Sequence, residues 1–201
     1  MQWILTALAR PRIGLERYLF VKFDAWNVLD LDLIRFAYPQ VPWIFLYRDP
    51  IEVLVSQLGH RGAHMVPGVI DPRLFGMDLS TATTIAPEEY CARVLAAVCE
   101  GAIHEYRHGG KLINYSELPD VVWTSLADFF GLTLAQPEVE CLRAAADRDA
   151  KNPLVAFEED ASQKQKKATR AVREAATKWL YPVYEKLEKA RLMDQAMKGE
   201  G

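Results

Sequence analysis

The stretch VPWIFLYRDPIEVLVS, residues 41–56, joins a strand pattern to a helix pattern without a gap. Residues 41–47 form a short apolar run rich in aromatic and β-branched side chains, which predicts a buried strand. Asp49 is a typical N-cap and Pro50 is favoured at the first helical position, so we predict a helix from Pro50 to about Leu58. A strand that turns directly into a helix is the repeating unit of α/β proteins.

Strand and helix patterns continue to alternate on both sides of this stretch. Strands are predicted over 18–23 and 111–115, and helices over 30–38, 87–107, 119–130 and 137–146. Residues 59–86 are rich in glycine and proline, so we expect a lid-like excursion there. The charged residues 162–193 are predicted to form one C-terminal helix. The sequence therefore predicts a single α/β domain over residues 1–201 with a mainly parallel sheet.

Composition excludes several classes of protein. The chain has 24 Lys and Arg against 27 Asp and Glu, a net charge of -3 that argues against a dedicated nucleic-acid binder. Its apolar runs are shorter than the roughly 18 residues of a membrane-spanning helix. The three cysteines form no C-x-x-C pair, and no basic residue precedes the apolar N-terminal run. We therefore expect a cytoplasmic protein with neither nucleic acid nor membrane as partner; the oligomeric state is left open.

Arg48 follows the predicted strand 41–47 directly. Ligands of open α/β sheets bind at the carboxyl ends of strands, and a helix N-terminus favours an anion. Arg48 would add a fork of donors suited to phosphate, and the hydroxyl of Ser56, two turns into the helix, could donate to the same anion. The alternative is that Arg48 pairs with Asp49 or a surface carboxylate and that Ser56 faces solvent.

A second group of polar residues lies in and after the predicted strand 18–23. Lys22 stands inside an otherwise apolar run, so its ammonium must reach water or find an anion. Asp24 could accept a proton from a substrate hydroxyl. The alternative is a turn or cap role for Asp24 and a surface ion pair for Lys22.

Together these segments resemble the sulfotransferases that use 3′-phosphoadenosine 5′-phosphosulfate (PAPS), most closely the bacterial members. The resemblance rests on FVKFD (20–24) and WIFLYRDPIEVLVS (43–56). It implies that Arg48 and Ser56 hold the 3′-phosphate of the nucleotide and that Lys22 contacts the transferred sulfonate. Asp24 stands where many relatives have a histidine base, so the resemblance leaves the base open between Asp24 and, less favoured, Asn27.

The resemblance extends to two later segments and lacks one early feature. KLINYSEL (111–118) resembles a late strand and turn of the family, and DAKNP (149–153) resembles its basic loop, which places Lys151 and, second, Arg148 on the nucleotide. The family opens with a strand and a Gly-rich phosphosulfate loop, for which this chain has no counterpart. The implied fold is a three-layer, P-loop-NTPase-like α/β domain, incomplete at its N-terminus, of which the chain supplies the C-terminal two-thirds.

The activity implied by the resemblance is transfer of a sulfonate from PAPS to a hydroxyl or amine of a small-molecule or glycan acceptor, without a metal. His60 and His64, in the excursion, are candidate acceptor contacts. The basic run Lys164, Lys166, Lys167, Arg170 and Arg173 is either a solvated helix face or a docking face for an acidic acceptor. Two alternatives stay open: a truncated, non-catalytic nucleotide-binding or interaction module, and a P-loop-type small-molecule kinase.

Overall fold

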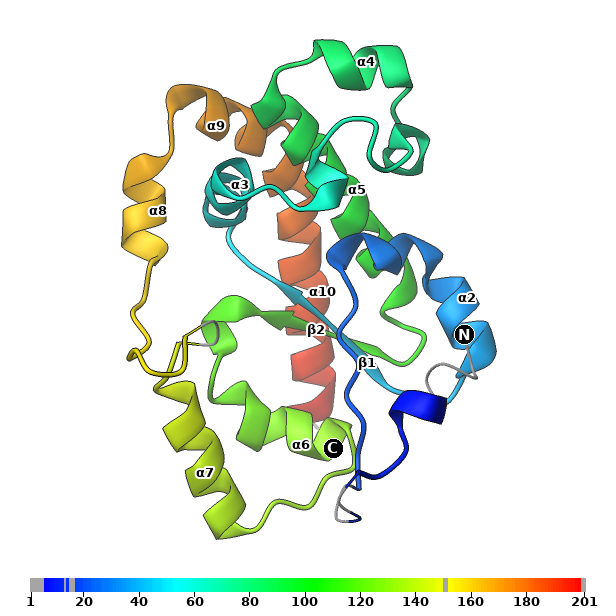
Figure 1. Ribbon diagram of the computed structural model, residues 1–201, viewed down its shortest axis with the longest axis vertical. Helices are drawn as coiled ribbons and strands as arrows, with labels where there is room; N and C mark the ends of the chain where they lie inside the picture. The colour runs from blue at the N-terminus through cyan, green and yellow to red at the C-terminus, as the bar shows by residue number, and fades with distance from the viewer. Residues whose placement is uncertain (1–5, 13, 15–16, 150–151, 200–201) are drawn as a thin grey trace.

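The computed structural model describes residues 6–12, 14, 17–149 and 152–199. It is a mixed α/β structure, mostly helical, in which a two-stranded parallel sheet lies among the helices (Figure 1). Strand β1 (Trp43–Tyr47) pairs with β2 (Gly110–Asn114), in a register that sets Trp43 opposite Gly110 and Tyr47 opposite Asn114. The sequence predicted both strands, and the α/β class with parallel pairing is confirmed.

The connection from β1 to β2 is helical. Helix α3 (Pro50–Gly59) begins at the predicted Asp49 cap and is followed by the short helices η2 (Ala63–Met65), η3 (Pro72–Phe75) and α4 (Leu79–Thr84). The excursion expected at 59–86 therefore contains three short helices. The long helix α5 (Pro87–Glu105) then leads to β2. Before β1, the chain forms η1 (Ala25–Asp30) and α2 (Leu31–Ala37).

After β2, all the named elements are helices. The elements are η4 (Tyr115–Glu117), η5 (Val122–Leu126), α6 (Ala127–Phe129), α7 (Gln136–Ala146), α8 (Ala161–Lys167), α9 (Arg170–Ala175), η6 (Ala176–Leu180) and α10 (Tyr181–Gly199). The single helix expected at 162–193 is therefore wrong. A non-helical Ala168 and an N-cap at Thr169, whose hydroxyl accepts from the backbone N–H of Val172 at 3.3 Å, separate α8 from α9.

Helix α5 forms the centre of the main hydrophobic core. It buries Tyr90, Cys91, Ala92, Val94, Leu95, Val98 and Ala102 against α3, α9 and η6. A smaller core joins Tyr47, Leu112 and Leu187, so α10 covers one face of the sheet. In Figure 1, α10 crosses the two strands, and α8 and α9 line one side of the molecule. None of the helices in the described ranges is both long enough and apolar enough to cross a membrane.

The predicted strand over 18–23 is wrong. Residues 17–24 have no regular secondary structure, and the side chains of Tyr18 and Phe20 are 59% and 63% exposed. Aromatic and β-branched content favours a strand only where a neighbouring strand can complete the hydrogen bonds. Within the described ranges the sheet consists of β1 and β2, which is smaller than the central sheet expected from the sequence.

Candidate functional site

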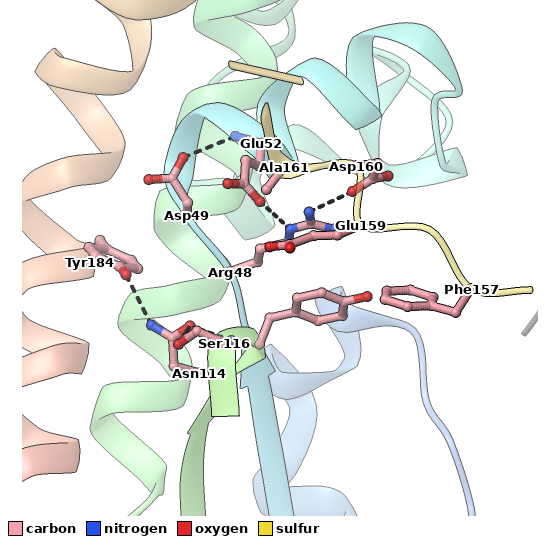
Figure 2. A pocket seen from close by; sticks show the side chains of 11 residues that line it. Arg48, Asp49, Glu52, Asn114, Ser116, Phe157, Glu159, Asp160, Ala161 and Tyr184 are labelled. Carbon is pink, nitrogen blue, oxygen red and sulfur yellow. Dashed lines mark hydrogen bonds and ion pairs between the residues drawn. The ribbon is translucent and has the colours of Figure 1, made fainter. Parts of the chain in front are cut away.

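A cavity of about 170 Å³ lies where the two parallel strands end. We call it the strand-end cavity. It is lined by Arg48, Asp49 and Glu52 after β1, by Asn114, Tyr115 and Ser116 after β2, by Phe157, Glu159, Asp160 and Ala161 before and at the start of α8, and by Tyr184 of α10 (Figure 2). The carboxyl ends of parallel strands are the usual ligand position in α/β proteins.

Arg48 is the central cation of this cavity. Its Nε donates to Glu52, one turn along α3, and its Nη2 donates to Asp160 Oδ1 at 2.6 Å (Figure 2). The guanidinium also lies 4.4 Å from the centre of the Tyr115 ring. Burial lowers the pKa of Arg48, but the bonds to Asp160 and Glu52 raise it by a larger amount. The net pKa is raised, so the guanidinium stays protonated. The expected position of Arg48 is thus found, together with carboxylate partners.

The first turn of α3 is already capped from within the chain. Asp49 accepts from the backbone N–H groups of Ile51 at 2.9 Å and Glu52 at 3.2 Å. Asp49 Oδ1 also accepts from Gln165 Nε2 at 2.9 Å, which ties α8 to the same place. These two N–H groups at the start of α3 are therefore already bonded to the Asp49 cap. An anion in this cavity would bind to Arg48 instead.

The base of the cavity is a fixed polar network. Asn114 is 6% exposed, and its Nδ2 donates to Tyr184 at 3.0 Å and to Glu188 at 2.9 Å. Its Oδ1 accepts from both the backbone N–H and the hydroxyl of Ser116, each at 3.0 Å. Because every polar atom of this amide is bonded, Asn114 shapes the cavity and has little capacity left for a ligand.

Three predicted residues lie outside the lining of the strand-end cavity. Ser56 is exposed on α3, and Lys22 and Asp24 are exposed in the extended segment 17–24. The backbone carbonyl of Asp24 accepts from the backbone and side-chain nitrogens of Asn27, at 2.9 and 3.1 Å. The Asp24 carboxylate makes no capping bond although it stands at the N-cap of η1. It is therefore free of a cap role in this structure.

His64 lies close enough to Asp24 for their charges to interact. The residue is 8% exposed, and its Nε2 has no hydrogen-bond partner in the described part of the chain. Burial lowers the pKa of His64, and the negative charge of Asp24 opposes this shift. A Cβ at Gly62 would lie 2.8 Å from the ring, so Gly62 leaves the space that His64 occupies.

The remaining predicted residues are dispersed. His60 is exposed at the end of α3, and Arg148 is exposed and pairs by an isolated bridge with Ala156. Lys151 lies outside the described residues. Across the described ranges no group of three His, Cys, Asp or Glu side chains is placed to hold a metal ion.

The ion pairs of Arg48 and the exposure of Ser56 agree with the alternative that Arg48 pairs with a carboxylate, although the sequence did not identify its two partners, Glu52 and Asp160. Glu52 stands four residues after Arg48, a spacing that alone indicates a helical ion pair. Asp160 is 112 residues away from Arg48 and gives no such local indication. With Asp49 and Glu159, four carboxylates line the cavity around one guanidinium.

A second, larger hollow of about 590 Å³ lies elsewhere, between residues 17–20 and the segment from η5 to α7. It is mostly apolar and is lined by Tyr18, Phe20, Val122, Leu126, Ala127, Phe130, Leu132, Leu134 and Leu142, with Arg17, Thr133 and Glu138 as its polar members. Phe20 and Phe130 meet edge to face, with ring centres 5.5 Å apart. This hollow is open and contains few polar groups.

No protein-family model, no curated protein and no solved structure matches this chain.

Proposed function

We propose that the strand-end cavity binds a phosphate group of an adenine nucleotide and that the chain is a cytoplasmic, PAPS-dependent sulfotransferase. The observation that carries the proposal is the placement of Arg48: it follows β1, stacks on Tyr115 after β2, and faces the cavity formed where both strands end. A guanidinium there offers a fork of donors that matches phosphate oxygens. The two strands would belong to a sheet of the P-loop-NTPase type.

In the proposed reaction, the strand-end cavity binds the nucleotide, and the segment 17–24 supplies the groups that act on the sulfonate and the acceptor. The acceptor oxygen or nitrogen attacks the sulfur of PAPS, the S–O bond to the nucleotide breaks, and adenosine 3′,5′-bisphosphate leaves. Lys22 would stabilise the sulfonate and the leaving oxygen, since a fixed cation is most effective where charge develops. Asp24 would take the acceptor proton, and Arg48 with Ser56 would position the nucleotide without chemistry. No metal enters this scheme.

The nucleotide assignment is tested by calorimetry with adenosine 3′,5′-bisphosphate. Arg48→Ala should weaken binding by about 10- to 100-fold, the range for loss of a charge-assisted contact. Arg93→Ala is the matched control, because Arg93 also pairs with a glutamate four residues away, Glu89, and stacks on an aromatic ring, that of Trp179, at 4.2 Å. Equal affinity of wild type and Arg48→Ala, or no binding by either, would overturn the assignment.

Transfer of labelled sulfonate from PAPS to a panel of alcohols, amines and glycans tests the catalytic part. Asp24→Asn should abolish transfer and leave nucleotide affinity nearly unchanged, because Asp24 lies outside the strand-end cavity. Asp30→Asn, six residues later and at the other end of η1, is the control for charge in this region. Full turnover by Asp24→Asn would show that another group takes the proton.

One observation favours the alternative of a non-catalytic interaction module. Glu52 and Asp160 already neutralise Arg48, so a ligand phosphate must compete with at least one of them. The module predicts no sulfonate transfer to any acceptor in the panel. It also predicts that Arg48→Ala acts on stability alone.

A further inference from the structure

Asp160 is held between two cations that come from different helices or their ends. Its Oδ1 accepts from Arg48 Nη2 at 2.6 Å, and its Oδ2 lies 2.7 Å from Lys164 Nζ. The side chains of Arg48 and Lys164 are each 18% exposed, whereas that of Asp160 is 48% exposed. Two largely covered cations thus converge on one carboxylate that stands at the open side of the site.

In this geometry the Asp160 carboxylate occupies the position that an external anion could take between the two cations. Each carboxylate oxygen takes one charge-assisted bond, and two oxygens of a phosphate can take the same two bonds. We propose that Arg48 and Lys164 form a phosphate site, that Asp160 fills it as an internal ligand, and that the phosphate of a bound nucleotide displaces Asp160. The nucleotide part of this inference rests on the proposed function.

The segment that carries Asp160 is attached by polar contacts. Helix α8 has no buried residue, and it meets the start of α3 through Asp160 with Arg48 and through Gln165 with Asp49. By contrast, α9 buries Val172 and Ala175 in the main core. Ala168 lies outside both helices. Displacing Asp160 and its segment would therefore break hydrogen bonds and ion pairs without opening the core.

The Asp160 carboxylate remains charged in neutral solution. Burial raises the pKa of Asp160, but its bonds to Lys164 and Arg48 lower the pKa by a larger amount. The net pKa is therefore below the ordinary aspartate value. Release at neutral pH therefore requires a competing anion. Displacement frees Lys164 together with Arg48, so one phosphate dianion would gain both cations that Asp160 now shares.

The test compares Asp160→Asn with wild type, using calorimetry with adenosine 3′,5′-bisphosphate and, separately, inorganic pyrophosphate. The amide keeps the shape of the side chain and removes the competing charge, so we expect both anions to bind about tenfold more tightly. Adding Lys164→Ala to Asp160→Asn should remove about tenfold of that affinity. Glu159→Gln is the matched control, because Glu159 lines the same cavity but is not bonded to Arg48 or Lys164.

The outcomes separate this inference from the proposed function. If wild type binds the nucleotide and Asp160→Asn binds it no more tightly than Glu159→Gln does, the internal ligand is refuted and the nucleotide site stands. If pyrophosphate alone gains affinity, the anion site stands and the nucleotide assignment fails. If neither anion binds either protein, both proposals are overturned. Asp160→Ser, checked for native circular dichroism, replaces Asp160→Asn should that variant misfold.

Discussion

Gly110 allows the two strands to pair where Trp43 begins β1. A Cβ at Gly110 would lie 2.5 Å from Cζ2 of Trp43, so the indole occupies the space of the missing side chain. Gly110→Ala must push the ring or the strand aside, and overpacking of this kind costs about 1–3 kcal/mol. We expect a lower free energy of unfolding in urea, with little change in the m-value.

Gly59→Ala serves as the control for that measurement. A Cβ at Gly59, the last residue of α3, meets nothing within 4 Å, and alanine is the better helix former. This variant should be neutral or slightly more stable. Equal loss of stability in both variants would show that the contact with Trp43 is not what makes Gly110 necessary.

At the residue scale, the sequence predicted what is local. The Asp49 cap and the Pro50 helix start follow from residues that are neighbours in the chain, and both are present. Arg48 was placed at a strand end for the same reason. Asp160, which Lys164 pairs with from four residues further along α8, reaches Arg48 only after α8 folds back onto α3. No spacing in the sequence encodes the contact between Asp160 and Arg48.

At the scale of elements, Glu188 links α10 to the ends of both strands. It accepts from Tyr47 at the end of β1, from Asn114 at the end of β2 and from Arg191 on its own helix. Burial raises the pKa of Glu188, but these bonds lower it by more, so the net pKa lies below the ordinary value of a glutamate. A carboxyl whose pKa is lower in the folded state stabilises the fold above its unfolded pKa. That contribution is lost as the pH falls through the folded pKa.

We therefore expect Glu188→Gln to be less stable than wild type at pH 7, by about 1–3 kcal/mol for a broken network. The difference should shrink as the pH falls below the ordinary glutamate pKa, because wild type then loses the stabilisation that the variant already lacks. Urea unfolding from pH 7 to pH 3 measures it. Glu185→Gln, an exposed position on the same helix, is the control. A gap between Glu188→Gln and wild type that stays constant with pH would contradict the assignment.

Elements with strong periodicity and clear ends were predictable. Strands β1 and β2 and helices α2, α3, α5 and α7 lie where the sequence placed them. The prediction of a strand at 18–23 failed because pairing depends on a partner, which residue type does not supply. The helix predicted at 162–193 failed because Thr169 is a cap inside a run of good helix formers.

At the scale of the whole molecule, burial is unevenly distributed. Helix α5 is buried along much of its length, whereas α7 and α8 have no buried residue. On β1, Ile44 and Leu46 are 37% and 45% exposed, on the face away from α10. In the three-layer fold that the resemblance implies, helices cover both faces of the sheet. The distribution of apolar residues alone could not show that this side of β1 is partly open.

The uneven burial of the elements predicts the order in which their backbone amides exchange hydrogen. Local opening costs least where few apolar contacts hold the backbone, so α7, α8 and residues 17–24 should exchange fastest. The amides of α5 and of the pairing strands should exchange slowest, close to the rate set by global unfolding, because freeing them requires the main core to open. Exchange followed by mass spectrometry, with the urea-unfolded chain as the reference for intrinsic rates, measures this order. Protection of α8 equal to that of α5 would contradict it, because polar contacts with α3 would then hold α8 as firmly as a buried core does.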